Sequence, residues 1–327
     1  MTMMNENPIE KIIGNSPCMM ELLDIVSMIA PKDVRIIIRG ERGTGKELIA
    51  NAIYSHSLRN KMPFIKLNCA TLSHDLLASE LFGHVKGSFT GATDTRTGLV
   101  MAADGGTLFL DEVADLSLEA QAAILRFLQE GEVRPIGSLQ TLKVNVRVIS
   151  ATNKNLEEAM VKGTFREDLN DRLNGFSLLI PPLRVRQEDI PSLVSHFIEK
   201  YNRKYDEHVS SFSKSAMAVL MNHIWKGNVR ELENVISRAV ILSRGKRRIV
   251  LDDIHDLIPI YETHKPLNLK QETILAIIKE KGRITVSSIL PQLGISDRAI
   301  RNHLEYLVKI GLVKMEGNKK NTTYTLP

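Results

Sequence analysis

The segment that most constrains the fold is the run GERGTGK at residues 40–46, which lies between a short apolar run and a stretch with helical periodicity. It fits the pattern GxxxxGK, in which glycines let backbone amides curl around phosphates and the lysine adds a cation. The start of the following helix also favours negative charge. Glu47 follows where the generic motif has a magnesium-binding Ser or Thr. The residues predicted to contact a nucleoside triphosphate are Gly40, Glu41, Arg42, Gly43, Thr44, Gly45, Lys46 and Glu47.

Short apolar runs rich in β-formers alternate with helical patterns over the first half of the chain. The predicted strands are 34–38, 64–67, 107–110 and 144–150, and helical patterns include 47–57 and 118–130. This alternation predicts an α/β domain with a mostly parallel sheet covered on both faces. After Pro181 and Pro182 the strand signals stop, and helical patterns follow at 190–205, 213–223 and 228–243. We therefore expect a second, all-helical subdomain.

The third predicted strand ends in two acids, Asp111 and Glu112. Behind a phosphate-binding loop, Asp111 can hold Mg²⁺ directly or through water, and Glu112 can orient and polarise an attacking water. The fourth strand is followed by Asn153, at the sheet edge where ligands collect, and its amide could sense the outer phosphate. Taken alone, an acidic turn after a core strand or an Asn that forms a turn would explain these residues equally well.

The composition favours a cytoplasmic protein with more than one domain. The chain has 327 residues and 43% hydrophobic content, and no apolar run approaches the roughly 20 residues of a membrane span. Its N-terminus lacks a basic segment followed by an apolar one, so we expect no export signal. Cys18 and Cys69 are the two cysteines, which argues against a disulfide framework or a cysteine-rich zinc site.

The net charge of +5 is unevenly distributed. Residues 265–327 carry eleven Lys and Arg against five Asp and Glu, so the rest of the chain is close to neutral. A compact basic module favours a polyanionic partner, and nucleic acid is the leading candidate. A solvated basic surface is the alternative.

From about residue 12 to 242 the chain resembles the central AAA+ domain of bacterial sigma-54-dependent enhancer-binding activators. The shared segments are IIGNSP (12–17), GERGTGKE (40–47), LNCA (67–70), SELFGHVKGSFTGA (79–92), GGTLFLDEV (105–113), FREDL (165–169), PPLR (181–184) and GNVRELENVI (227–236). In this family Glu is the usual residue at the position of Glu47. The resemblance implies an AAA+ ATPase with ATP and Mg²⁺ as cofactors, and a sheet domain followed by a helical lid.

The resemblance also assigns roles to residues outside the generic motifs. Arg166 and Arg172 match the arginine fingers that reach a neighbouring subunit's ATP, where a planar guanidinium can neutralise the transferring phosphoryl group. Arg230 matches the second sensor, and Asn68 matches a residue that holds the catalytic glutamate, here Glu112, in an inactive pose. These roles imply a ring, typically a hexamer, whose monomer is nearly inactive. The alternative for any single arginine is a surface salt bridge.

The run GSFTGA corresponds to the hexapeptide GAFTGA, which in relatives touches the sigma factor from the tip of a loop. The residues are Gly87, Ser88, Phe89, Thr90, Gly91 and Ala92, with Ser88 in place of Ala. Glycines permit a mobile tip, and an exposed Phe offers a compact apolar contact. The resemblance thus implies sigma-54 RNA polymerase as the partner. A glycine-rich loop with one anchoring aromatic is the alternative.

The basic C-terminal segment resembles a winged helix from about 267 to 326. Predicted helices cover 269–281, 286–293 and 297–310, with Ser296 as the cap of the third. Runs at 312–315 and 322–326 predict a hairpin whose tip, 317–321, carries two lysines. The predicted DNA-contacting residues are Ser296, Arg298, Arg301, Asn302, Lys319 and Lys320. A winged helix that contacts protein is the alternative.

Together these patterns predict three domains: an α/β ATPase subdomain at 8–180, a helical lid at 181–258 and a winged-helix DNA-binding domain at 265–327. We expect an activator that uses ATP hydrolysis to remodel sigma-54 polymerase. The alternatives are a DNA-binding regulator that uses ATP only to assemble, and a general protein-remodelling AAA+ machine. About a dozen residues precede Ile12. We therefore expect no N-terminal sensory domain, and control by abundance, by a partner in trans or by the C-terminal module.

Overall fold

The computed structural model describes residues 12–71, 74–89, 92–243, 245–254, 257–258, 269–309, 313–316 and 322–325. The described residues form two compact units. The first contains those up to Asp206 together with Trp225–Ser237, and the second contains Glu207–Ile224 and those from Arg238 onward. No helix in these ranges combines the length and apolarity that crossing a membrane requires.

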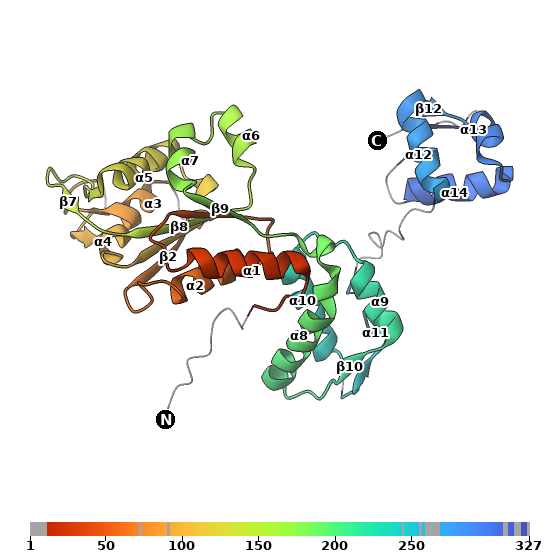
Figure 1. Cartoon of the computed structure of the whole chain (residues 1–327), viewed down its shortest axis with the longest axis horizontal. Coiled ribbons are helices and arrows are strands. Elements are labelled where there is room, and N and C mark those ends of the chain that lie inside the picture. Colours follow the sequence, from red (N-terminus) through yellow and green to blue (C-terminus); the bar gives the residue numbers. More distant parts are fainter. Residues whose placement is uncertain are drawn as a thin grey trace. The chain divides into compact units, whose positions relative to one another are not determined.

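A five-stranded parallel sheet forms the centre of the first unit (Figure 1), and its strand order is β2-β5-β8-β1-β9. Its strands are β1 Ile36–Arg39, β2 Phe64–Asn68, β5 Thr107–Asp111, β8 Arg147–Thr152 and β9 Phe176–Leu179. In register, Ile36 pairs with Ile149 on one side and with Phe176 on the other. The predicted α/β class and parallel sheet are confirmed, and β9 adds an edge strand that the sequence reading did not predict.

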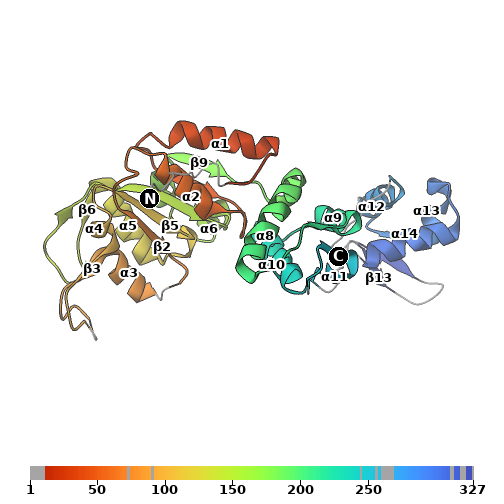
Figure 2. The same cartoon turned by 90° about the horizontal axis from the view of Figure 1, so that it is seen from below.

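Helices cover both faces of this sheet (Figures 1 and 2). Side chains alternate along each strand, so Ile36 and Ile38 pack with α1 (Pro17–Ile29) and α2 (Lys46–Ser55), whereas Ile37 joins the opposite layer. That layer contains α3 (His74–Phe82), α5 (Leu118–Glu130) and α7 (Glu167–Leu173). Burial on both faces explains why the strands are continuous apolar runs, with each buried Ile contributing about 1.5–3 kcal/mol.

Two small hairpins project from the α/β layers. One pairs β3 (Gly83–His84) with β4 (Arg96–Thr97), and the other pairs β6 (Glu132–Val133) with β7 (Leu142–Lys143). A bridge between His84 and Ile136 joins them. Two short helices also belong to this unit: α4 (Leu99–Ala102) follows β4, and α6 (Leu156–Val161) follows β8.

The segment predicted to be an all-helical lid is mainly helical, but that prediction is wrong in one respect. Its helices are α8 Ile190–Tyr205, α9 Lys214–Asn222, α10 Asn228–Ile241 and α11 Leu251–Ile254. Between them, β10 (Ser211–Phe212) pairs in parallel with β11 (Arg248–Ile249). Two-residue strands are too short to produce a periodic signal, and this explains why the sequence reading missed them.

The C-terminal residues form three helices and a small antiparallel sheet. The helices are α12 Leu269–Lys281, α13 Val286–Leu293 and α14 Asp297–Lys309, as the sequence predicts to within one residue. The sheet has the order β12-β14-β13, with β12 Arg283–Ile284, β13 Lys314–Glu316 and β14 Thr323–Thr325. Ile300, Leu304 and Leu307 of α14 are fully buried in the core that these elements share. The predicted hairpin tip with Lys319 and Lys320 lies outside the described residues.

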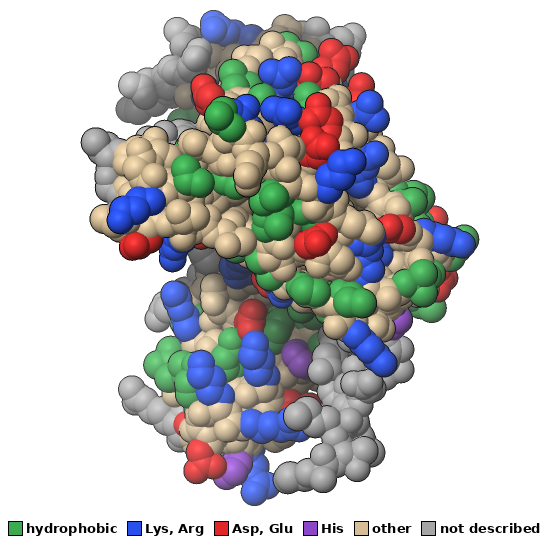
Figure 3. Space-filling model, turned by 90° about the vertical axis from the view of Figure 1, so that its left-hand side faces the viewer, with side chains coloured by type: hydrophobic (Ala, Val, Ile, Leu, Met, Phe, Trp, Pro, Cys, Tyr) green, Lys and Arg blue, Asp and Glu red, His purple; other side chains and the backbone are tan. Residues whose placement is uncertain are grey.

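The face of the molecule in Figure 3 carries basic and acidic side chains interspersed with apolar ones. The charges on that face are therefore mixed. Charges of one sign attract a charged ligand strongly only where they gather in one place.

Candidate nucleotide-binding site

A cavity of about 710 Å³ opens where β1, β2, β5 and β8 end and α2 begins. In doubly wound α/β folds, ligands bind outside the carboxyl ends of the strands. The described residues that line it are Arg42, Gly43, Gly45, Lys46, Glu47, Leu48, Asn51, Asn68, Ala70, Thr71, Asp111, Glu112, Asp115, Asn153, Val229, Arg230 and Glu233. The phosphate-loop residues and the acidic pair, far apart in sequence, thus meet at one place.

The phosphate-binding loop has the backbone shape that its glycines predict. Gly43 and Gly45 have φ angles of +80° and +103°, a region that glycine adopts without steric cost. A Cβ at Gly43 would lie 2.2 Å from the carbonyl oxygen of Gly227, just before α10. The loop and the start of α10 are therefore in direct backbone contact.

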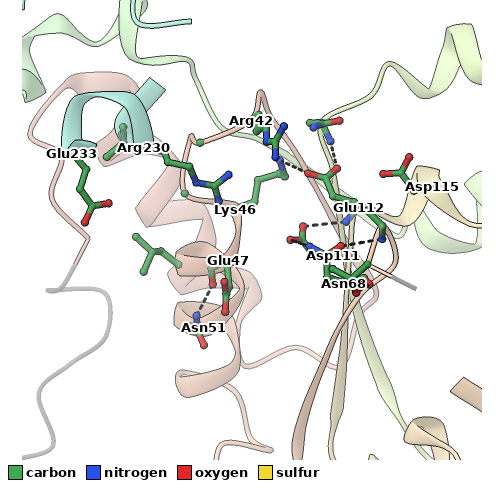
Figure 4. Close-up of a pocket in the computed structure, with 17 residues that line it drawn as sticks. Arg42, Lys46, Glu47, Asn51, Asn68, Asp111, Glu112, Asp115, Arg230 and Glu233 are labelled. Atoms are coloured by element: carbon green, nitrogen blue, oxygen red, sulfur yellow. Dashed lines mark hydrogen bonds and ion pairs between the residues drawn. The ribbon is translucent and has the colours of Figure 1, made fainter. Parts of the chain in front are cut away.

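Lys46 lies at the base of the cavity and is only 7% exposed. Its Nζ donates to the Gly40 carbonyl at 3.1 Å and forms an ion pair with Glu112 at 3.3 Å (Figure 4). The other carboxylate oxygen of Glu112 accepts the backbone N–H of Asn153 at 3.0 Å. Glu112 is thus held between the phosphate-loop lysine and the end of β8.

The backbone of Glu112 is itself unusual, with a φ of +53° between β5 and the 3₁₀ turn Val113–Asp115. Non-glycine residues rarely adopt this left-handed conformation, which costs roughly 1–3 kcal/mol. The turn directs the carboxylate toward Lys46 (Figure 4).

Asp111 is the one lining carboxylate for which the described residues provide no ion pair. One of its oxygens accepts the Glu112 N–H at 3.0 Å. Burial, followed by the neighbouring charge of Glu112, raises the pKa of Asp111 above its ordinary value. A half-buried carboxylate beside another acid fits Mg²⁺, because a hard divalent cation prefers oxygen ligands and relieves both effects.

Three predicted residues hold the site together without lining the large cavity. Gly40 supplies the carbonyl that binds Lys46, and Thr44 donates to the Glu41 carbonyl at 2.8 Å. The Glu41 carboxylate accepts both terminal nitrogens of Arg184, at 2.6 and 2.7 Å, and the Asn228 amide at 3.2 Å. Glu41 therefore ties the loop to the chain before α8 and to α10.

Asn68 lines the cavity, but its partner differs from the one that the resemblance implies. Its side-chain amide donates to Oδ2 of Asp111 at 3.4 Å, whereas Glu112 contacts Lys46 and Asn153. Its own side-chain oxygen accepts the Ala70 N–H at 2.9 Å. In this structure Asn68 orients the candidate metal ligand.

The resemblance to the family assigns roles to Arg166, Arg172 and Arg230. Of these three, only Arg230 lines the large cavity. Arg166 forms a two-point pair with Asp168, at 3.0 and 2.7 Å, beside a second, open cavity. Arg172 lies exposed in the last turn of α7, and no ion pair to it occurs in the described ranges. Neither Arg166 nor Arg172 lines the large cavity.

Four residues of the GSFTGA run are described, and they form a compact turn. The Gly87 N–H donates to the Ala92 carbonyl at 2.9 Å, while Thr90 and Gly91 lie outside the described residues. Phe89 is 41% exposed and packs edge-on against His84, with ring centroids 5.1 Å apart. The Ser88 hydroxyl is buried, and among the residues that the structure describes it has no hydrogen-bond partner. The turn is thus partly packed against the hairpins rather than fully extended.

The described candidate DNA contacts lie on the outer side of α14. Ser296 caps the helix by accepting the Ala299 N–H at 3.3 Å. Arg298, Arg301 and Asn302 are exposed, and Arg301 pairs with Asp297 at 2.6 Å. These positions agree with the predicted helix face.

Sequence reasoning missed a small apolar cavity of about 90 Å³ beside the phosphate loop. Its described lining consists of Ile12, Ile13, Met19, Thr44, Gly45, Leu48, Ile49, Ile180, Arg186, Leu193, His196, Phe197 and Val229. The apolar pair Ile12 and Ile13, just before α1, was its clearest signal in the sequence. An apolar pocket next to a phosphate site suits a planar base.

Comparison with known proteins agrees with this geometry. A family model described as the Sigma-54 interaction domain matches residues 12–179, and one described as the AAA+ ATPase lid domain matches residues 184–267. The transcriptional regulatory protein ZraR of Escherichia coli is 42% identical over 296 residues, covering 88% of this chain and 67% of ZraR. The transcriptional regulatory protein GlrR of Escherichia coli is 50% identical over 234 residues, covering 72% of this chain and 53% of GlrR.

Solved structures of other proteins have similar folds. NtrX from Brucella abortus in complex with ATP aligns with a TM-score of 0.69 and 36% identity, covering 91% of this chain and 69% of that chain. A mutant of RuvB from Thermotoga maritima aligns with a TM-score of 0.54 at 12% identity, which is a likeness of fold alone.

The chain spans between about half and two thirds of the length of these curated relatives. The sigma-54 model nevertheless covers more than half of the chain, and the cavity joins the phosphate loop to the acidic pair. The chain therefore belongs to the AAA+ ATPases that carry a sigma-54 interaction domain, the family of the transcriptional regulators ZraR, GlrR and NtrX.

Proposed function

We propose that this protein is a sigma-54-dependent transcription activator, an oligomeric ATPase that binds upstream DNA and remodels the closed complex of sigma-54 polymerase. The main support is that one α/β unit contains both the nucleotide cavity and the GSFTGA run. Asn68 at the end of β2 lines the cavity together with Ala70 and Thr71, which follow it, and the chain then leads through α3 to that run. A short, continuous segment thus connects the nucleotide to the polymerase contact.

Within the cavity, Lys46 binds the outer phosphates and Glu112 orients the attacking water. Asp111 is the residue that would hold Mg²⁺, which neutralises charge on the phosphates when bound. The small apolar cavity takes the adenine. Because Lys46 is now paired with Glu112, phosphate oxygens compete for its ammonium group. Nucleotide entry should therefore loosen this pair and leave the glutamate able to act on water.

Hydrolysis requires assembly, because Arg166 and Arg172 lie away from their own cavity. We infer a ring, a hexamer by family, in which Arg172 reaches the neighbouring subunit's phosphates and Arg166 exchanges Asp168 for a phosphate partner. An arginine supplied in trans accelerates phosphoryl transfer by about 10³–10⁵-fold. We therefore expect Arg172→Ala to lower turnover by about that factor while ATP affinity, measured by titration, changes little. Full turnover in the variant would remove Arg172 from this role.

The C-terminal helices and sheet serve as a winged-helix DNA-binding domain. The support is that Arg298, Arg301 and Asn302 of α14 are exposed, and that residues 265–327 contain an excess of Lys and Arg. Removal of these residues should weaken promoter DNA binding and its dependence on salt. An unchanged affinity would favour a protein partner for this module.

Two other functions are compatible with parts of the molecule. A regulator that uses ATP only for assembly would have no need of the Asp111–Glu112 pair, and a general remodelling machine would have no need of a DNA-binding module. The deciding experiment measures promoter opening by sigma-54 polymerase on a template with the upstream site. We expect single-stranded promoter DNA only with hydrolysable ATP, and none with Lys46→Ala. Vigorous ATP hydrolysis without promoter opening would refute the proposed activator function.

A further inference from the structure

The charges that line the nucleotide cavity are of the wrong sign for its proposed ligand. The described lining contains three cations, Arg42, Lys46 and Arg230. It contains five carboxylates, those of Glu47, Asp111, Glu112, Asp115 and Glu233. The lining alone therefore carries two more negative than positive groups, which disfavours a polyanionic triphosphate.

Three of the five carboxylates are paired with lysines that do not line the cavity. Lys66 Nζ lies 2.9 Å from Oε1 of Glu47, Lys154 Nζ lies 2.5 Å from Oδ1 of Asp115, and Lys200 Nζ lies 2.6 Å from Oε1 of Glu233. We call Lys66, Lys154 and Lys200 the outer lysines. They come from β2, the segment after β8, and α8. Counting them reverses the balance to one net positive charge.

Additional contacts fix two of the outer lysines in place. Lys66 also donates to the Asn51 side chain at 2.8 Å, and its Nζ lies 5.2 Å from the centre of the Phe64 ring. Lys200 lies 5.5 Å from the centre of the Tyr201 ring, and the Tyr201 hydroxyl donates to the same Glu233 oxygen at 3.0 Å. Such second contacts reduce the freedom that a single exposed ion pair would keep.

We propose that the outer lysines are positioning residues that hold the rim carboxylates and set the affinity of the site for nucleotide phosphates. This inference rests on the proposed nucleotide-binding function. The outer lysines are 40–51% exposed, so each pair contributes little to folding. Removal of a positive charge near a multiply charged ligand lowers the affinity for that ligand, however, and this effect weakens as the salt concentration increases.

The proposal predicts a pattern that depends on ligand charge. Replacement of an outer lysine by methionine keeps most of the side-chain volume and removes the charge. We expect Lys66→Met, Lys154→Met and Lys200→Met each to weaken ATP binding about two- to fivefold at low salt. The loss should be smaller for ADP, absent for adenosine, and largely abolished at high salt.

The test is calorimetric titration of the full chain with ATP, ADP and adenosine at low and high salt. The matched control is Lys32→Met, which removes an exposed lysine near the opposite end of β1. The double variant Lys154→Met with Asp115→Asn removes both members of a pair and should restore ATP affinity. The pair Lys200→Met with Glu233→Gln provides a second such cycle.

Several results would overturn the proposal. They are unchanged ATP affinity in all three single variants at low salt, an equal loss for ATP and adenosine, or a double variant no better than the lysine variant alone. Lys46→Ala separates this failure from failure of the proposed function. If the unaltered chain binds ATP and Lys46→Ala does not, the nucleotide site stands whatever the outer lysines do. If the unaltered chain binds no nucleotide, both proposals fail.

Discussion

Ser88→Ala should stabilise the packed position of the GSFTGA turn. The Ser88 hydroxyl is buried, and no described residue gives it a hydrogen-bond partner; a Cβ at Gly137 would lie 2.6 Å from the Ser88 Cβ, which shows how closely the two loops approach. A buried hydroxyl without a hydrogen bond costs about 1–3 kcal/mol, and alanine removes that oxygen while keeping the Cβ contact. Taking the lower value, the packed position gains about 1 kcal/mol, a factor of about five in population.

Hydrogen exchange of backbone amides measures this gain directly. The Val85 N–H donates to the Ile136 carbonyl at 3.0 Å, and the Ile136 N–H donates to the Gly83 carbonyl at 2.9 Å, so both amides report on separation of the loops. We expect their exchange to slow about fivefold in Ser88→Ala. Ser138→Ala is the control, because its hydroxyl accepts the Gln140 N–H at 3.0 Å and its loss should not slow exchange. Unchanged or faster exchange in Ser88→Ala would refute the argument.

Three further predictions concern the core of the site. Gly43→Ala should weaken ATP binding at least tenfold, because the new methyl group meets the carbonyl before α10, whereas Gly163→Ala, at φ +69° with open space around it, should leave binding unchanged. Glu41→Gln should destabilise the fold by at most about 1 kcal/mol at neutral pH, since this ion pair is half exposed. Hydrogen bonding to its arginine partner holds the pKa of Glu41 below 4.5, so the difference in thermal unfolding should persist above that pH and vanish as pH falls through the lowered value. Burial, then the nearby carboxylates, raise the pKa of Cys69 to about 12, so iodoacetamide at pH 8 should label the partly exposed Cys18 and leave Cys69 unmodified until the protein unfolds, as mass spectrometry would show.

The sequence was sufficient to predict most of the α/β unit, because its signals are local. A glycine-rich loop between a strand and a helix places Lys46, and an apolar run that ends in two acids places Asp111 and Glu112. Parallel strands then bring these residues to one edge of the sheet. Their convergence in one cavity therefore follows from topology, and the resemblance to the family predicted Arg230 at the same cavity.

Features that depend on long-range pairing could not be predicted in this way. Strand β9 lies at the edge of the sheet with three of its four residues exposed, and β10 with β11 is too short to show a pattern. The Asn68 side chain was assigned to Glu112, whereas side-chain orientation places it on Asp111. The packing of the Phe89 ring on His84, five residues earlier, is local, but it depends on side-chain orientation, which the sequence pattern does not show.

The left-handed backbone of Glu112 has a consequence for how this position can change over evolutionary time. Glycine would adopt a φ of +53° without cost, and asparagine tolerates it better than glutamate does. Selection for stability alone would therefore move the position away from glutamate, since either replacement relaxes the turn. Both replacements would remove the carboxylate that faces Lys46. Under the proposed function, a glutamate at position 112 is therefore kept for its carboxylate, and the strained backbone is the cost of keeping it.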